Sequence, residues 1–435
     1  MNYKETLEAL HSIPRRKKEE NLHRMNRLME ILGNPHEEQQ YIHVAGTNGK
    51  GSISRMLEEV LLLSGYRTGL FTSPYIFDFR ERIQIDNQMI SEEDVIFYFE
   101  NVKAAGEKLE TEGYSFPSEF EVVTAMAFLY FRDQKVDVAL IEVGIGGLYD
   151  ATNVIKPVLS LIASINFDHT AVLGHTLDSI AWHKAGIMKG NPTISTSQQP
   201  EVRRVLKKKA EEVSSRLKFT STREMKFLEM DGLHQKIRYD LRSRKSLTIR
   251  LSLLGIHQML NAGVVLHAAE ELKRLGYEKI SDEAITLALE KVRWPGRMEV
   301  ISEKPLLIID GAHNMDGAIN LKESLAFYFP GKSVILLLGM LRDKDVETVT
   351  KVLSRNTKKV VCFTPDDFRA LEAERLLPLL HEGAVGETAD SFQDAIEKAL
   401  DAYEEGDLIL CAGSLYTIGD MEHAFKKHRT RKSRI

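Results

Sequence analysis

The sequence has little of what marks secreted, membrane or nucleic-acid-binding proteins. Its 435 residues include only two cysteines, Cys362 and Cys411, which provide neither a disulfide framework nor a cysteine-based zinc site. No apolar run approaches the roughly 18 residues that span a bilayer. Lys and Arg total 58 and Asp and Glu total 63, so the net charge of −5 gives no sequence-wide attraction to nucleic acid or anionic membrane. The segment Met1–Arg15 lacks the apolar stretch of a signal peptide, and we expect a cytoplasmic protein that binds neither nucleic acid nor membrane.

The length of the chain requires two or three domains, and its first part alternates short apolar runs with helical periodicity. This alternation is typical of a parallel sheet wrapped by helices, the α/β class. The predicted strands are Tyr41–Ala45, Thr68–Thr72, Val136–Val143 and Val158–Ile165. The predicted helices are Ser52–Ser64, Ser91–Glu110, Glu121–Gln134 and Ser179–Ala185.

The pattern changes twice toward the C-terminus. Between about Phe219 and Leu253 short alternating stretches predict antiparallel strands, and Ile256–Leu275 reads as a helix. Pro295 and Gly296 then interrupt both periodicities, and a second α/β alternation follows. We therefore predict two domains, residues 1–295 and residues 296–435. Strands of the second are expected at Leu306–Ile309, Ser333–Leu338, Lys359–Phe363 and Leu408–Cys411.

The most informative segment is the glycine-rich stretch that follows the strand Tyr41–Ala45. It reads Gly46, Thr47, Asn48, Gly49, Lys50, Gly51 and Ser52, and a helix follows. Glycines turn backbone N–H groups inward, while a helix N-terminus and a lysine add positive charge, so the segment predicts a phosphate site. The general phosphate-loop spacing would place glycine at Val44 and a hydroxyl at Gly51, so the match is imperfect, and a simple glycine turn is the alternative.

A carboxylate supports the phosphate site. Glu142 ends the apolar strand Val138–Ile141, where a nucleotide-bound Mg²⁺ is commonly held. The guanine-reading NKxD sequence is absent, which favours ATP over GTP.

Further motifs occur in order along the chain: HVAGTNGKGS, TSP, FRERI, FEVVTAMAF, EVGIGG, DATN, DHTAVLG, KAGI, LLGIHQMLNA, WPGRME, DGAHN, GMLRDKD and CAGSLYTIG. Over residues 2–420 this set resembles the folylpolyglutamate synthase and dihydrofolate synthase family of the Mur ligase superfamily. The resemblance implies a Mur-ligase-like central domain with a phosphate loop and parallel sheet, plus a smaller Rossmann-like C-terminal domain. It also implies that ATP phosphorylates a folate carboxylate and that the amine of L-glutamate then attacks the acyl phosphate.

The resemblance assigns roles to individual residues. ATP would be held by residues 46–52 together with Asn261, Arg297 and Asp310. Ser73, Glu142 and His169 match metal ligands for Mg²⁺. Lys50, Lys184 and His313 would act at the reacting groups, and Lys184 matches a lysine that becomes carbamylated and helps bind a second metal ion.

The pteroate side of the family site is also represented, with departures. Residues matching the pteroate contacts are Ser118, Phe120, Glu121, Tyr149, Asp150 and Ala151. Ser118 stands where the family more usually has threonine, Leu148 where it has arginine, and His183 where it has glutamate. The loss of charge at Leu148 bears most directly on substrate choice.

Three hypotheses remain open from sequence. The first is a folate–glutamate ligase, with or without dihydrofolate synthase activity, that acts as a monomer on folate, L-glutamate and ATP. The second is a Mur-type amide ligase for another carboxylate, which Leu148 and His183 motivate. The third is a nucleotide-binding relative without ligase activity.

Overall fold

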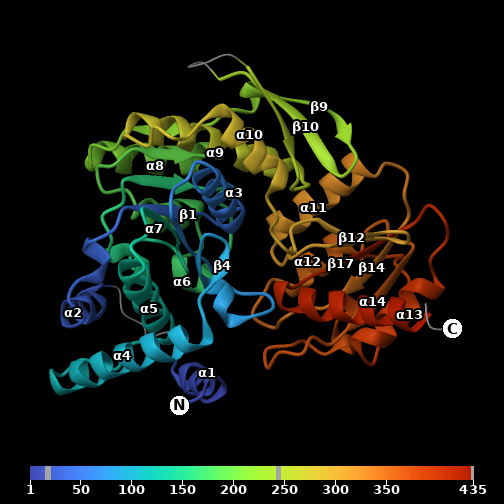
Figure 1. Cartoon of the computed structure of the whole chain (residues 1–435). Coiled ribbons are helices and arrows are strands. Elements are labelled where there is room, and N and C mark those ends of the chain that lie inside the picture. The colour runs from blue at the N-terminus through green and yellow to red at the C-terminus, as the bar shows by residue number, and fades with distance from the viewer. Residues whose placement is uncertain (15–20, 242–245, 433–435) are drawn as a thin grey trace. The chain divides into compact units, whose positions relative to one another are not determined.

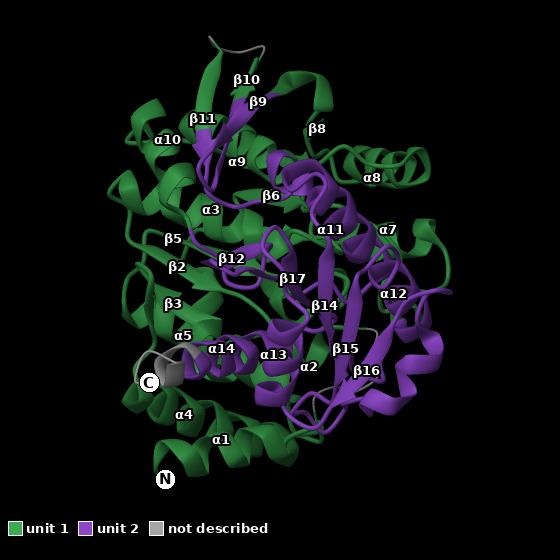
Figure 2. Ribbon diagram, turned by 90° about the vertical axis from the view of Figure 1, so that its right-hand side faces the viewer, with its two compact units in different colours: residues 1–226, 238–249, 260–292 green, residues 227–237, 250–259, 293–435 purple. Residues whose placement is uncertain are grey.

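The computed structural model describes residues 1–14, 21–241 and 246–432, and the chain divides into two compact units (Figure 2). Unit 1 comprises residues 1–226, 238–249 and 260–292. Unit 2 comprises residues 227–237, 250–259 and 293–435. The long segment of unit 2 begins close to the boundary predicted between residues 295 and 296, but unit 2 also takes two earlier segments. The two-domain division at that boundary stays a prediction.

Unit 1 is built on an eight-stranded sheet, two of whose strands, β1 and β4, are labelled in Figure 1. The strand order among the described residues is β4-β3-β2-β5-β1-β6-β7-β8. The six strands β2, β5, β1, β6, β7 and β8 run parallel, while β3 and β4 form an antiparallel edge. The strands are β1 (Tyr41–Ala45), β2 (Thr68–Phe71), β3 (Ile83–Ile85), β4 (Gln88–Met89), β5 (Val138–Glu142), β6 (Leu159–Ile162), β7 (Thr193–Ser195) and β8 (Leu217–Phe219). Every residue of β1 and β5 is buried, as expected for central strands of a parallel sheet covered on both faces.

Helices complete unit 1 and supply most of its apolar core. They are α1 (Tyr3–Ser12), α2 (His23–Ile31), α3 (Lys50–Leu63), α4 (Glu92–Thr111), α5 (Glu119–Asp133), α6 (Thr170–Leu173), α7 (Leu177–Ala185), α8 (Pro200–Glu212), α9 (Ile256–Arg274) and α10 (Asp282–Lys291). Helix α5 is buried along nearly its whole length, and its Phe128 ring packs on Tyr41 of β1 with a centroid distance of 5.6 Å. This packing fixes one face of β1, the strand that leads into the glycine-rich loop.

A three-stranded sheet, in the order β11-β10-β9, divides between the two units. Its strands are β9 (Met225–Asp231), β10 (His234–Tyr239) and β11 (Leu247–Leu251). Helix α9 follows it, so the predicted change of pattern after Phe219 is present in the structure.

Unit 2 is a second α/β layer on a six-stranded sheet, in the order β12-β13-β17-β14-β15-β16 among its described residues. Only β12 runs antiparallel to its neighbour. Its strands are β12 (Glu299–Glu303), β13 (Leu306–Ile309), β14 (Val334–Leu338), β15 (Lys359–Phe363), β16 (Gly386–Ala389) and β17 (Leu408–Ala412). Its helices are α11 (Met315–Tyr328), α12 (Val346–Leu353), α13 (Phe392–Asp401) and α14 (Ile418–Lys432).

The predicted α/β class is confirmed, with a parallel-core sheet in each unit. In the described part of the chain no helix is long and apolar enough to cross a membrane. Cys362 and Cys411 are both buried free thiols, on β15 and β17.

Candidate active site

The glycine-rich loop between β1 and α3 is shaped by two positions that exclude a side chain. Gly46 has φ of 152°, and a Cβ there would lie 2.6 Å from Cβ of Ala163. Gly49 has φ of 92°, and a Cβ there would lie 2.8 Å from Oδ1 of Asn261. Only glycine satisfies both the backbone angle and the space. Asn261, in the second turn of α9, therefore lies against the loop, and its role in nucleotide binding stays a prediction.

The other loop residues continue the same turn. Thr47 and Asn48 pair with the chain at Ser164, beyond the end of β6, and the Thr47 amide donates to the Ser164 carbonyl at 2.7 Å. Gly51 and Ser52 lie in the first turn of α3, whose N–H groups have no acceptors within the helix. The N-terminal end of α3 and the glycine turn together have the features of an anion site, and phosphate binding there stays a prediction.

Two lysines from distant parts of the chain meet at the carbonyl oxygen of Gly46. Nζ of Lys50 donates to it at 3.2 Å and lies 3.8 Å from Oε1 of Glu142. Nζ of Lys184, on α7, donates to the same oxygen at 2.7 Å. Burial, followed by the nearby charge of Lys50, lowers the pKa of Lys184 to about 7. Lys184 therefore loses its proton near pH 7, whereas an exposed lysine keeps its proton until the pH is well above that value.

The predicted metal ligands come from neighbouring strand ends. Ser73 follows β2 and Glu142 ends β5, and the pairing of Phe71 with Ile141 puts both at one edge of the sheet. His169 precedes α6 with φ of 49°, its Nε2 3.9 Å from a carboxylate oxygen of Asp168.

The chemistry of these donors fits Mg²⁺ only if other ligands join them. Among the described residues, no group of three or more His, Cys, Asp or Glu side chains could hold a metal ion. Mg²⁺ commonly takes one or two carboxylates and completes its shell with water and nucleotide phosphates. A carboxylate beside the lysine of a phosphate loop, as Glu142 is beside Lys50, suits that arrangement.

Within unit 2 the structure brings Arg297, Asp310 and His313 together. Asp310 directly follows β13, and its carboxylate accepts the amides of Met298 and Ala312, both at 2.8 Å. Burial raises the pKa of Asp310, and the Arg297 guanidinium opposes that shift. Nδ1 of His313 donates to the carbonyl of Gly311 at 2.8 Å, because a carbonyl only accepts. Neutral His313 therefore carries its hydrogen on Nδ1.

Two of the residues predicted to bind pteroate, Ser118 and Glu121, are used by the fold itself. The Glu121 carboxylate accepts the Ser118 amide at 2.8 Å and the Ser118 hydroxyl at 2.7 Å, a capping box at the start of α5. It also accepts Nη2 of buried Arg24, at 2.8 Å. Sequence reasoning missed Arg24, whose only signal is a basic residue on an otherwise apolar helix face.

The other predicted pteroate residues lie around the loop after β5. Ala151 is buried in the short helix η3 (Ala151–Val154), and Asp150 caps that helix. The Phe120 ring reaches this loop, since a Cβ on Gly144 would lie 2.6 Å from it. The side chain of Tyr149 is 37% exposed. Pteroate binding by Phe120 and Tyr149 stays a prediction.

The two charge-losing departures from the family pattern are neighbours in space. The Leu148 amide donates to the carbonyl of His183 at 2.8 Å. The rings of Tyr149, Trp182 and His183 pack edge to face beside them, with centroid distances between 5.0 and 6.3 Å. His183 belongs to this aromatic cluster and Leu148 lies beside it, so an imidazole and an aliphatic side chain stand where the family pattern has a glutamate and an arginine.

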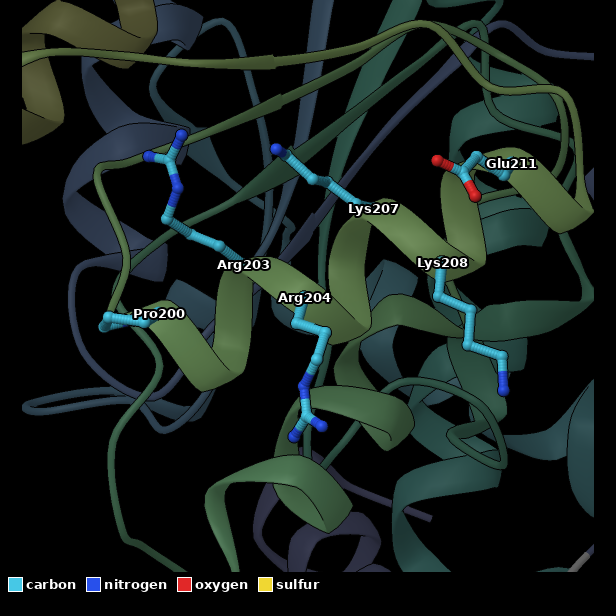
Figure 3. Close-up of a pocket in the computed structure, with 6 residues that line it drawn as sticks. All are labelled: Pro200, Arg203, Arg204, Lys207, Lys208 and Glu211. Atoms are coloured by element: carbon cyan, nitrogen blue, oxygen red, sulfur yellow. The ribbon is translucent and has the colours of Figure 1, made fainter.

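A surface hollow elsewhere in unit 1 shares no residue with the predicted site. One face of α8 lines it, with Arg203, Arg204, Lys207 and Lys208 as its basic side chains (Figure 3). Arg204 pairs with Asp178 at 2.8 Å. We interpret it as the solvated face of a charged helix.

Comparison with known proteins agrees with this geometry. Residues 44–269 match the model of the Mur ligase middle domain, and residues 296–415 match that of the Mur ligase, glutamate ligase domain. The chain is 36% identical over 420 residues to a folylpolyglutamate synthase of Lacticaseibacillus casei, covering 96% of this chain and 97% of the relative. It is 36% identical over 409 residues to a dihydrofolate synthase/folylpolyglutamate synthase of Bacillus subtilis, covering 93% and 95%.

A solved structure gives the same result. The folylpolyglutamate synthase of Mycobacterium tuberculosis, complexed with ADP and AMPPCP, superposes with a TM-score of 0.85 at 29% identity, covering 97% of this chain and 98% of that one. The phosphate loop and the two α/β units thus define a Mur ligase, and the resemblance is confirmed. Within that class, the chain belongs to the folylpolyglutamate synthase and dihydrofolate synthase family.

Proposed function

We propose that this protein joins L-glutamate to a carboxylate of tetrahydrofolate with hydrolysis of ATP, extending a polyglutamate chain. The observation that carries the proposal is the meeting of Lys50 and Lys184 at the Gly46 carbonyl, in a glycine loop at the N-terminus of α3. The charge of Lys50 and the N-terminus of α3 suit the polyphosphate of ATP. The folate carboxylate and the amine of L-glutamate are proposed as the other two reacting groups because the chain belongs to this family.

The chemistry requires the carboxylate to be activated, because it is anionic and has no good leaving group. A carboxylate oxygen attacks the γ-phosphorus of ATP, ADP leaves, and an acyl phosphate forms. The neutral amine of glutamate attacks the acyl carbon, inorganic phosphate departs with the transferred oxygen, and the amine loses a proton. The task of the protein is charge neutralisation and alignment.

The residue roles in this scheme are proposals. Residues 46–52 and Asn261 hold the nucleotide, with Lys50 at the β- and γ-phosphates. Arg297 and Asp310, which belong to unit 2, are also assigned to nucleotide binding. His313, whose neutral ring carries its hydrogen on Nδ1, faces the reacting groups.

We further propose one or two Mg²⁺ ions, which supply charge neutralisation at the phosphates when bound. Ser73, Glu142 and His169 would hold the first. A carbamate on Lys184 would turn a cation into an anion and help hold the second. The pKa of about 7 at Lys184 supports this, because CO₂ reacts with the neutral amine.

The phosphate-release assay with two carboxylate substrates tests the function. Purified protein, ATP, Mg²⁺ and glutamate are mixed with tetrahydrofolate in one arm and dihydropteroate in the other. Phosphate release with tetrahydrofolate alone indicates a monofunctional folylpolyglutamate synthase, and release in both arms adds dihydrofolate synthase activity. Release in neither arm, from folded protein that binds ATP, contradicts the proposal and favours another carboxylate or a non-catalytic relative.

We also propose that the protein works as a monomer in the cytoplasm.

A further inference from the structure

A buried hydrogen-bond chain links β1 to the loop that follows β5. Nε2 of His43 lies 2.9 Å from Oγ1 of Thr152. The same hydroxyl donates to Oδ1 of Asp150 at 2.6 Å. His43 and Thr152 are fully buried and Asp150 is 7% exposed. These hydrogen bonds thus join residues more than a hundred positions apart in the sequence. The family motifs assign no role to His43 or Thr152.

The direction of each hydrogen bond follows from the groups involved. An ionised carboxylate only accepts, so the single hydroxyl hydrogen of Thr152 points to Asp150. His43 must therefore carry its hydrogen on Nε2 and donate to Thr152. Burial, followed by the charge of Lys189, lowers the pKa of His43 to about 3, so the ring is neutral at working pH. Its Nδ1 is then a bare acceptor, and it has no hydrogen-bond partner among the described residues.

Most of the hydrogen-bond acceptor positions of the Asp150 carboxylate are filled by the Thr152 hydroxyl and by backbone amides of its own loop. Besides the Thr152 hydroxyl, its carboxylate accepts the amide of Ile145 at 2.9 Å and the amide of Thr152 at 3.1 Å. A carboxylate has about four acceptor positions, so little of Asp150 is left for a ligand. Asp150 therefore holds the shape of loop 144–149.

The helix η3 that follows is fixed from a second side. Nδ2 of Asn153 donates to the Leu148 carbonyl at 3.0 Å and to the Gly186 carbonyl at 3.2 Å. Gly186 ends α7, the helix that carries Lys184. The DATN segment thus ties loop 144–149 both to β1, which leads into the phosphate loop, and to α7.

We propose that His43 and Thr152 are positioning residues for the carboxylate substrate. Acting through Asp150, they set the conformation of loop 144–149, and with it the placement of Tyr149 and of the Phe120 ring that packs on Gly144. A buried imidazole with one unpaired nitrogen is costly, and leucine would fill the space without that cost. His43 therefore serves the geometry of the loop and adds little to stability. This inference rests on the proposed function.

Replacement of Thr152 gives the first test, with Thr193→Val as matched control. Thr193 is a fully buried threonine of β7, and its hydroxyl bonds Ser215 at 2.9 Å, so the control also loses a buried hydroxyl. We expect Thr152→Val to raise the KM for tetrahydrofolate about tenfold, the effect of losing one buried hydrogen bond, with the KM for ATP changed less than about twofold. Thr152→Ser, which keeps the hydroxyl, should restore the KM. Thr193→Val should change neither KM.

Replacement of His43 gives the second test. His43→Leu should keep the melting temperature within about 5 °C of wild type while raising the KM for tetrahydrofolate. His43→Gln, which keeps an N–H donor, should recover part of that KM. A Thr152→Val enzyme with the kinetics of Thr193→Val, or one whose KM values for ATP and tetrahydrofolate rise together, overturns the inference. Wild-type protein that turns over neither carboxylate overturns the proposed function itself and this inference with it.

Discussion

Two glycine-rich loops follow adjacent strands of unit 1, and they use their polar groups in opposite ways. The phosphate loop follows β1 and loop 144–149 follows β5, at the edge where Val44 pairs with Glu142. The phosphate loop leads into the first turn of α3, whose N–H groups lack acceptors within the helix. Loop 144–149 and the DATN segment bind their own carboxylate, hydroxyl and amide groups to neighbouring backbone. Two motifs of the same family pattern can thus differ in role, because one offers groups to a ligand and the other stabilises the conformation of a loop.

The largest effect expected from this comparison is at Lys50. Lys50→Ala removes the full positive charge of the open loop, and we expect turnover to fall more than about a hundredfold. Among the described residues its side chain contacts two backbone carbonyls and makes a 3.8 Å ion pair, so the far-ultraviolet circular dichroism and melting temperature should stay near wild type. Phosphate release and thermal unfolding measure the two quantities. Unchanged turnover would remove Lys50 from the mechanism.

Replacement of Asp150 tests whether its carboxylate stabilises loop 144–149. In Asp150→Asn one acceptor oxygen becomes an NH₂ group that faces N–H and O–H donors, and we expect the free energy of unfolding to fall by about 2 to 3 kcal/mol. The matched control Tyr149→Phe changes a 37% exposed side chain next to it and should stay within about 0.5 kcal/mol. Urea unfolding measures both variants. Equal stability of Asp150→Asn and wild type would mean that the carboxylate is not needed to hold the loop.

How far these features could be predicted from sequence depends on how local they are. The phosphate loop and Glu142 were predictable, because glycine, lysine and strand endings leave marks within a few residues. The short strands β7 and β8 were missed, since three apolar or mixed residues show no clear period. The pairs Arg24–Glu121 and His43–Thr152 join residues about a hundred positions apart, and no local pattern indicates which buried polar groups will meet. The saturation of Asp150 is likewise visible only once the loop is folded.

The smallest expected effect concerns Lys184, which links the two loops through Gly46 and α7. Its pKa is about 7 in the fold against an ordinary value of 10.5, so the unfolded chain binds more protons between these pH values and stability should rise with pH there. From about pH 7 to about pH 9, we expect the free energy of unfolding of wild type to gain about 2 kcal/mol relative to Lys184→Met. Below about pH 7 the difference should be constant. A flat difference across the whole range would contradict the burial of an unmodified amine.

The central claim is that the phosphate loop brings the γ-phosphate of ATP to a carboxylate. The fate of the carboxylate oxygen tests this most directly. Tetrahydrofolate labelled with ¹⁸O in its carboxylates is turned over with ATP and glutamate, and the released phosphate is analysed by mass spectrometry. Transfer of the carboxylate oxygen to phosphorus and departure of that phosphate predict one ¹⁸O atom in each phosphate released. Product formation with unlabelled phosphate would contradict activation through an acyl phosphate.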